Sequence, residues 1–285
     1  MSEFPFSVAL ALGGGGARGL AHIAVLEALD ELGVRPCAIA GTSIGAIVGA
    51  AYAAGFSGAE LRAHAENMFR NRVRLARRLL RSRARRRART FSDFAHPALI
   101  DAERFLDAFW PQGMPETFEE LQIPFTAVAT DFRLRREAAI SSGLLQPAVG
   151  GSMAIPGLVR PVVHGDSFLI DGGLVNPLPY NHLAGRADIV LAVDVSGTSS
   201  GRARNRPPSP IETIIVASQI MMNAISERMI EENPPDVLIS PAVNQYLALD
   251  LFKAKRIFEA ADACRARVFE GLQTAAARLE LQRRA

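Results

Sequence analysis

The chain has 285 residues, of which 49% are hydrophobic and 21% are charged, and its formal net charge is +3. This length allows one large domain or two small ones, and the apolar fraction excludes a mainly disordered chain. The charge is unevenly distributed, because Arg70–Arg89 contains eleven Arg and no acidic residue. The rest of the chain carries 21 basic and 29 acidic side chains, a balance of −8. We therefore expect an acidic globular body with one concentrated cationic segment.

Composition also excludes several classes of protein. Cys37 and Cys264 are too few for a disulfide framework and do not form a zinc motif, so we expect neither a metal nor a cofactor. The longest run without a charge, Pro36–Ala59, has 24 residues and would suffice to span a bilayer. Its five glycines favour a buried strand, turn and helix instead. No signal peptide is expected, because no basic region precedes the first apolar stretch. We expect a cytoplasmic protein, or one peripheral on the inner face of the membrane.

Short apolar runs alternate with segments of helical periodicity along the chain. In chain order, the expected elements are a strand at 6–12, a helix at 19–32, a strand at Cys37–Ala40, helices at Ile44–Ala54, 58–89 and Asp101–Trp110, strands at Phe125–Thr130, Ala138–Ser141, Leu169–Ile170 and Ile189–Asp194, a helix at about 211–232, a strand at Val237–Ser240 and a helix at about 251–283. This alternation predicts a layered α/β fold around a mostly parallel sheet. No internal repeat or domain linker is seen, so 1–285 is predicted to be a single domain.

A glycine-rich sequence, Gly13–Gly19 (Gly-Gly-Gly-Gly-Ala-Arg-Gly), lies between the first strand and the first helix. Glycines let the backbone approach a ligand closely, and N–H groups at the start of a helix can hold an anion. The segment also fits a dinucleotide-binding pattern, which requires an acidic residue at the end of the second strand. This chain has Gly41-Thr42-Ser43 there. Dinucleotide binding is therefore disfavoured.

Two further motifs follow predicted strands. Gly41–Gly45 is Gly-Thr-Ser-Ile-Gly, a Gly-x-Ser-x-Gly pattern that makes a sharp turn and exposes the hydroxyl of Ser43 when it joins a strand to a helix. Asp171–Gly173 is Asp-Gly-Gly, which would be an ordinary turn if it stood alone.

The order of these three motifs resembles the patatin-like phospholipase family, especially its compact bacterial members. Shorter segments share the resemblance: Ala129–Asp131, Ser141–Gly143, Ser152–Gly157 and Asn176–Pro179. The likeness covers about 6–195 well and continues more loosely through Asp236–Pro241 and the final helix. It implies a patatin-like three-layer α/β/α fold with a mostly parallel central sheet. No family signature is found in 70–110, so a basic helical or lid insertion is expected at about 62–110.

The resemblance implies that Ser43 is a nucleophile and that Asp171 is its general base, in a dyad without histidine. A serine hydroxyl needs a nearby proton acceptor to become nucleophilic. An exposed aspartate is a poor acceptor, with a pKa of about 3.9, but partial desolvation raises its basicity. A Ser-His-Asp triad is the rival arrangement, and only His182 follows Asp171 in the chain, as that order requires. The serine turn follows the second strand, earlier than a triad hydrolase would place it, so the triad is disfavoured.

The resemblance also assigns an oxyanion hole. The backbone N–H groups of Gly14, Gly15 and Gly16 are expected to stabilise the tetrahedral intermediate, together with the N–H of Ile44. Three roles stay open for Arg18: it orients the glycine loop, holds an anionic group of the substrate, or forms an ordinary salt bridge.

These residues predict a serine acyl hydrolase that cleaves ester bonds of phospholipids or lysophospholipids. The alternative is a patatin-like scaffold without enzymatic activity, used for regulation or partner binding. The presence of both Ser43 and Asp171 favours the enzyme.

The cationic segment Arg70–Arg89 begins as a basic amphipathic helix, a pattern that can lie on an anionic membrane surface. Contact with a membrane, or a role as a lid, is one interpretation. A solvated surface or a self-association surface is the second. Nucleic-acid binding is disfavoured, because interleaved aromatic residues and a recognisable binding module are both missing.

Overall fold

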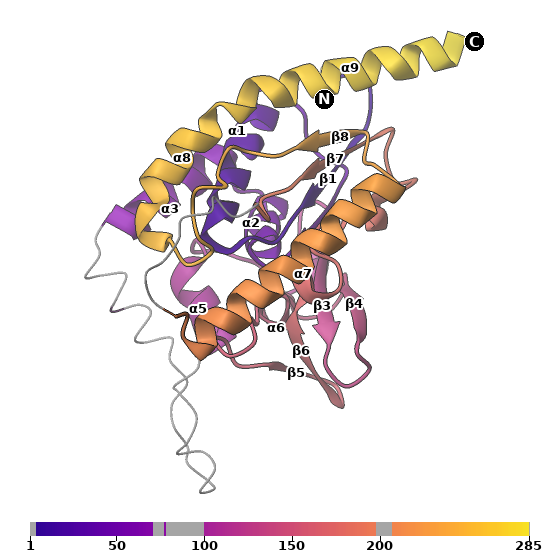
Figure 1. Ribbon diagram of the computed structural model, residues 1–285. Helices are drawn as coiled ribbons and strands as arrows, with labels where there is room; N and C mark the ends of the chain where they lie inside the picture. Colours follow the sequence, from indigo (N-terminus) through magenta and orange to yellow (C-terminus); the bar gives the residue numbers. More distant parts are fainter. Residues whose placement is uncertain (1–3, 71–76, 78–99, 198–206, 285) are drawn as a thin grey trace, which may run out of the picture.

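The computed structural model describes residues 4–70, 77, 100–197 and 207–284, and within them the chain forms an eight-stranded mixed sheet with helices on both faces (Figure 1). The strands are β1 (Val8–Leu12), β2 (Ala38–Thr42), β3 (Phe125–Asp131), β4 (Arg136–Ile140), β5 (Val162–His164), β6 (Ser167–Asp171), β7 (Ile189–Val193) and β8 (Val237–Ile239). Their order is β5-β6-β3-β2-β1-β7-β8, and β4 also pairs with β3. The pairs from β3 through β2, β1 and β7 to β8 are parallel, whereas β4, β5 and β6 pair antiparallel.

The helices are unevenly divided between the two faces. They are α1 (His22–Glu31), α2 (Ile44–Ala53), α3 (Gly58–Arg70), α5 (Ala102–Phe109), α6 (Leu145–Ser152), α7 (Pro210–Glu232), α8 (Ala254–Asp262) and α9 (Cys264–Arg284). Figure 1 shows α1, α3, α8 and α9 gathered on one side of the sheet, while α7, in orange, crosses the other side. Short 3-10 turns connect them: η1 (Gly16–Ala21), η3 (Phe118–Glu120), η4 (Gly172–Leu174), η5 (Tyr180–Leu183) and η6 (Leu251–Lys253).

The alternation of side chains along the buried strands explains the two layers. In β1, Leu10 and Leu12 enter the large core that α1 and α2 share, whereas Ala9 and Ala11 face the opposite side. That second face is covered by η5 and by the end of α7, and its strand residues are mostly alanines. Small side chains let these covering segments approach the sheet closely.

The predicted fold class is confirmed: the chain is an α/β protein with a mixed, mostly parallel sheet. The apolar run at 36–59 forms β2 and α2, and no helix among the described residues is long and apolar enough to cross a bilayer. The expected helix at 251–283 is instead divided into η6, α8 and α9. Sequence periodicity did not indicate α6, whose eight residues include a proline and two glycines.

The expected insertion at about 62–110 is only partly described. Its ends are helical, in α3 and α5, and both helices pack on the main core through residues such as Leu61 and Leu106. Most of Arg70–Arg89 lies outside the described residues, so the interpretations of this segment, contact with a membrane among them, stay predictions.

One detail of the sheet positions the functional residues. β2 pairs with the first part of β3, ending where Thr42 lies opposite Val128. β6 runs in the opposite direction and pairs with the last part of β3, ending where Asp171 lies opposite Ala129. Since β4 occupies the other edge of β3 along Ala127–Asp131, β2 and β6 share one edge. Their carboxyl ends therefore meet at adjacent positions of β3.

Candidate active site

Ser43 stands at a sharp turn between β2 and α2. Its φ of 55° and ψ of −119° lie outside the regions that a serine ordinarily occupies, a strain of about 1–3 kcal/mol. The flanking glycines make the turn sterically feasible. A Cβ on Gly41 would lie 2.5 Å from the carbonyl oxygen of Gly45, and a Cβ on Gly45 would lie 2.0 Å from that of Leu12. The Gly-x-Ser-x-Gly spacing is thus required by the packing of α2 against the strand ends.

The meeting of β2 and β6 brings Ser43 to Asp171. The Ser43 hydroxyl donates a hydrogen bond of 2.8 Å to Oδ2 of Asp171, and each residue is 5% exposed. The other carboxylate oxygen, Oδ1, accepts the N–H of Gly173 at 2.8 Å. Burial raises the pKa of Asp171 to about 6, although the Gly173 and Ser43 hydrogen bonds oppose this rise. The carboxylate is therefore a stronger proton acceptor than an exposed aspartate and is still ionised at neutral pH.

Two hydroxyl groups hold this pair in place. Ser152 accepts the backbone N–H of Ser43 at 2.9 Å and donates to the carbonyl oxygen of Val128 at 2.5 Å. Thr130 donates to the carbonyl oxygen of Asp171 at 2.8 Å. Neither residue was predicted from the sequence to belong to the site. Both lie in segments that carried the family resemblance, but their role depends on contacts between distant parts of the chain.

The three glycines that were assigned to the oxyanion hole, Gly14, Gly15 and Gly16, differ in their surroundings. The N–H of Gly14 donates to the carbonyl oxygen of Pro177 at 2.9 Å, so the structure shows this group already bonded within the protein. Gly15 and Gly16 line the pocket that contains the Ser43–Asp171 pair. Gly16 has a φ of 61°, and a Cβ there would lie 2.4 Å from the carbonyl oxygen of Ala248. Within the loop, the oxyanion role therefore fits Gly15 and Gly16 better than Gly14.

The other predicted donor, Ile44, is the first residue of α2 and directly follows Ser43. Its side chain packs on the glycine loop, since a Cβ on Gly19 would lie 2.2 Å from Cγ2 of Ile44. The start of α2 also favours negative charge because of the helix dipole. Its assignment to the oxyanion hole stays a prediction.

Arg18 is buried, 4% exposed, and its guanidinium bonds to the backbone. Nε donates to the carbonyl oxygen of Gly15 at 3.2 Å, and Nη1 donates to that of Gly197 at 3.4 Å. Burial lowers the pKa of Arg18, while the nearby charge of Asp194 raises it. Among the three roles left open by the sequence, these contacts support orientation of the glycine loop.

The histidines with described contacts serve other places. His182 bonds to Glu137, His22 bonds to the carbonyl oxygen of Gly13, and His64 bonds to that of Phe109. In the described part of the chain, the Ser43 hydroxyl is paired with Asp171. No cluster of His, Cys, Asp or Glu suited to a metal ion is found among the described residues.

The Ser43–Asp171 pair opens into a small pocket of about 420 Å³, its mouth included. One wall comes from α7, through Ile215, Ser218, Gln219 and Met222. Met222 packs closely over the site, since a Cβ on Gly173 would lie 2.5 Å from its terminal methyl carbon. A hydroxyl, a buried carboxylate and backbone N–H groups in one pocket are the parts that acyl transfer requires.

Comparison with known proteins agrees with this chemistry. A family model described as "Patatin-like phospholipase" matches residues 10–184, which is more than half of the chain. The chain belongs to the patatin-like phospholipase family. The match spans all three motifs, from the glycine loop to Asp171–Gly173.

Several proteins are similar to this family member. An uncharacterized NTE family protein of Mycobacterium tuberculosis is 39% identical over 203 residues, a match that covers 71% of this chain and 52% of that protein. Lysophospholipase NTE1 of Kluyveromyces lactis is 29% identical over 279 residues, covering 89% of this chain and 18% of that protein. The chain thus spans about half the length of the mycobacterial relative and less than a fifth of the fungal one.

Two solved structures are also similar. VipD from Legionella pneumophila superposes with a TM-score of 0.49 at 13% identity, over 94% of this chain and 67% of that chain. Human GIVD cytosolic phospholipase A2 superposes with a TM-score of 0.45 at 13% identity, over 95% of this chain and 60% of that chain.

Proposed function

We propose that this patatin-like protein is a serine acyl hydrolase that cleaves ester bonds of phospholipids or lysophospholipids. The observation that carries the proposal is the 2.8 Å hydrogen bond from the Ser43 hydroxyl to a buried carboxylate, that of Asp171. A structural hydroxyl would not need the strained backbone that Ser43 adopts.

In the acylation step, Ser43 Oγ attacks the carbonyl carbon of the ester while its proton moves to Oδ2 of Asp171. The carbonyl oxygen becomes an oxyanion, which the N–H groups of Gly15, Gly16 and Ile44 stabilise. When the tetrahedral intermediate collapses, the bond to the leaving alcohol breaks and the alcohol takes the proton from Asp171. The product is an acyl ester on Ser43, and the Asp171 carboxylate is restored.

In the deacylation step, water replaces the alcohol. Asp171 accepts a proton from the water as its oxygen attacks the acyl carbon, and Ser43 recovers that proton when the acyl bond breaks. The free carboxylic acid leaves. Every atom is supplied by substrate, water or the two side chains, so no cofactor is required for this chemistry.

The substrate class rests on weaker support than the reaction. Fungal relatives that match most of this chain are named lysophospholipases, and the family description names phospholipases. An apolar pocket wall built from α7 residues such as Ile215 and Met222 fits a lipid ester. We therefore place phospholipids and lysophospholipids ahead of small polar esters.

The proposal is tested with purified wild type, S43A and D171N. Wild type is expected to react with a fluorophosphonate probe and to release fatty acid from lysophosphatidylcholine. S43A is expected to lose both reactions, and D171N to lose nearly all turnover. S142A removes an exposed serine and serves as the control, with labelling and turnover as in wild type. Labelling that persists in S43A would place the nucleophile elsewhere.

The rival function is a patatin-like scaffold that binds a partner without catalysis. It predicts a wild-type protein that neither reacts with the probe nor cleaves lysophospholipids or short-chain p-nitrophenyl esters. The burial of the Asp171 carboxylate, whose cost exceeds what its two hydrogen bonds return, argues against this rival, since a scaffold gains no stability from it.

A further inference from the structure

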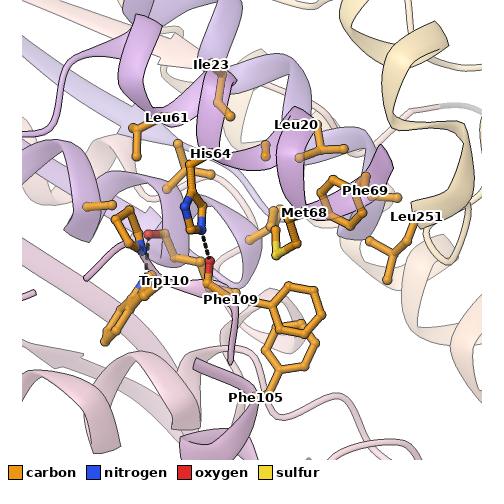
Figure 2. Close-up of a pocket in the computed structure, with 17 residues that line it drawn as sticks. Leu20, Ile23, Leu61, His64, Met68, Phe69, Phe105, Phe109, Trp110 and Leu251 are labelled. Carbon is orange, nitrogen blue, oxygen red and sulfur yellow. Dashed lines mark hydrogen bonds between the residues drawn. The ribbon is translucent and has the colours of Figure 1, made fainter. Parts of the chain in front are cut away.

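Buried polar side chains outside the catalytic pair differ in how they are bonded. In the apolar pocket between α2, α3 and α5, His64 Nε2 lies 2.9 Å from the carbonyl oxygen of Phe109, and Trp110 Nε1 donates to that of Ile47 at 3.1 Å (Figure 2). These two bonds join the three helices and have an ordinary structural role. Asn176 is different, because its buried side-chain oxygen Oδ1 has no hydrogen-bond partner among the described residues.

Two acceptors fix the orientation of the Asn176 side chain. Nδ2 donates to Oε2 of Glu137 at 3.1 Å and to Oδ1 of Asn181 at 2.8 Å. A carboxylate can only accept, so the amide nitrogen must face Glu137 and the amide oxygen is left unpaired. An unpaired buried acceptor costs free energy that an apolar side chain of similar size would not. Stability alone therefore does not account for an asparagine at this position.

The backbone of Asn176 and of the next residue contacts all three motifs. The N–H of Asn176 donates to the carbonyl oxygen of Gly172, which follows the proposed base, at 2.9 Å. Its carbonyl oxygen accepts the hydroxyl of Thr42, which precedes the proposed nucleophile, at 2.8 Å. The carbonyl oxygen of Pro177 accepts the N–H of Gly14 at 2.9 Å. One dipeptide thus links the base, the serine turn and the glycine loop.

Glu137 anchors the amide from outside the three motifs. It lies on β4 and is half-buried. Its second carboxylate oxygen, Oε1, accepts a hydrogen bond from Nε2 of His182, which lies in η5. The His182 hydrogen bond is the main cause that lowers the pKa of Glu137. The carboxylate is therefore ionised at neutral pH and accepts on both oxygens.

We propose that Asn176 is a positioning residue for the reaction of Ser43 with an ester, and that Glu137 holds it in the orientation that this role requires. This inference rests on the proposed function of Ser43 and Asp171. The Asn176 amide does not touch the ester. It acts through the backbone of Asn176 and Pro177, which sets where the glycine loop lies relative to the nucleophile. A displacement of about 1 Å in such a site can lower turnover about 100-fold.

The first test reverses the hydrogen bonding of residue 176 without changing its shape. N176D places an acceptor against Glu137 and against Oδ1 of Asn181. It should lower kcat for p-nitrophenyl butyrate about 100-fold and change KM less than about threefold, because positioning acts on the transition state. E137A should lower kcat about tenfold in the same way, as expected for one lost hydrogen bond. E232A is the matched control: it breaks the exposed Arg228–Glu232 ion pair and should behave as wild type.

A double variant separates positioning from a merely structural role. In N176D/E137Q, the new amide at position 137 can donate to the new carboxylate and still accept from His182, so kcat should recover to within about tenfold of wild type. A structural role would lower the melting temperature and leave kcat of the folded protein unchanged. Unchanged kcat in folded E137A, or no recovery in the folded double variant, would overturn the proposal. Since Glu137 is half-buried, E137A gives this decision even if N176D does not fold.

Amide hydrogen exchange separates this proposal from the proposed function. The Gly14 N–H, which is bonded to Pro177, should exchange at least about tenfold faster in N176D and E137A than in wild type. Unchanged exchange at Gly14 in both variants would overturn the link between Asn176 and the glycine loop. A wild type that cleaves no ester would overturn the proposed function, while the exchange measurement would still decide whether Asn176 holds the loop.

Discussion

Asp171 is the residue whose environment decides the chemistry. The residue is 5% exposed, and among the described residues its carboxylate accepts hydrogen bonds from Ser43 and Gly173 alone. Loss of hydration dominates, so its pKa rises to about 6 instead of falling as it does for Asp131, where Leu134 and Ser167 donate to the carboxylate. In the proposed reaction, this environment tunes the base toward neutral pH without a histidine.

This tuning predicts the pH dependence of hydrolysis. The base must be ionised to accept the Ser43 proton, so activity requires a pH above the pKa of Asp171. We expect kcat/KM for a short-chain ester to be level above about pH 7 and to fall about tenfold per pH unit below about pH 6. A profile measured from pH 4.5 to 8 tests this. A midpoint near pH 4 would mean that the working carboxylate is a solvated one.

At the scale of elements, the serine turn and α2 form one unit with the strand ends. Gly45 and Gly49 both lie in α2, but their surroundings differ. An added methyl on Gly45 would meet the Leu12 carbonyl oxygen at 2.0 Å, while on Gly49 the nearest atom is a Phe125 ring carbon at 3.1 Å. Backbone cannot move away from the first contact, whereas a ring can adjust to the second.

The difference between Gly45 and Gly49 gives a direct prediction for the serine turn. G45A should lower the free energy of unfolding by at least about 3 kcal/mol and abolish activity, because α2 must shift away from β1. G49A should change it by less than about 1 kcal/mol, since the helix propensity gained by alanine offsets the tighter contact. Urea unfolding with esterase assays measures both. Similar losses in the two variants would show that general crowding of α2, rather than the turn, is decisive.

The elements that local patterns describe were predictable, and those set by distant contacts were not. Gly41–Gly45 between a strand and a helix identified the serine turn, because steric demands of that turn are local. Ser152 and Thr130 were missed as supporting residues, since a hydroxyl in a helix or strand has no periodic signature. The wall that α7 contributes to the catalytic pocket was also missed, because Ile215 and Met222 line the same pocket as Ser43 only through contacts between distant parts of the chain.

At the scale of the whole molecule, two buried titratable groups have opposite effects on stability as the pH changes: His22, which bonds to Gly13 of the glycine loop, and Asp171, which pairs with Ser43. Burial lowers the pKa of His22 to about 4, although its bond to the Gly13 carbonyl oxygen raises it. A carbonyl only accepts, so neutral His22 donates through Nε2–H at 2.8 Å. Folding thus favours the uncharged form of both His22 and Asp171. Between about pH 4 and 6, a fall in pH therefore changes the free energy of unfolding in opposite directions through His22 and through Asp171.

Because the two effects oppose each other, His22 and Asp171 together should change the free energy of unfolding of wild type little between about pH 6 and pH 4. Variants that lack one of the two groups should show opposite slopes against pH. As pH falls from about 6 toward 4, the unfolded chain protonates His22 first, which lowers stability, while the folded chain protonates Asp171 first, which raises it. H22Q, which keeps an N–H for Gly13, should therefore gain stability relative to wild type as pH falls, and D171N should lose it. Shifts of about two pKa units correspond to about 3 kcal/mol at most for each group. Urea unfolding at pH 4.5, 5.5 and 7 measures the free energy of unfolding of each variant relative to wild type. The exposed carboxylates, which all three proteins share, cancel in that difference. Parallel curves for the three proteins would show that neither group is buried as an uncharged form.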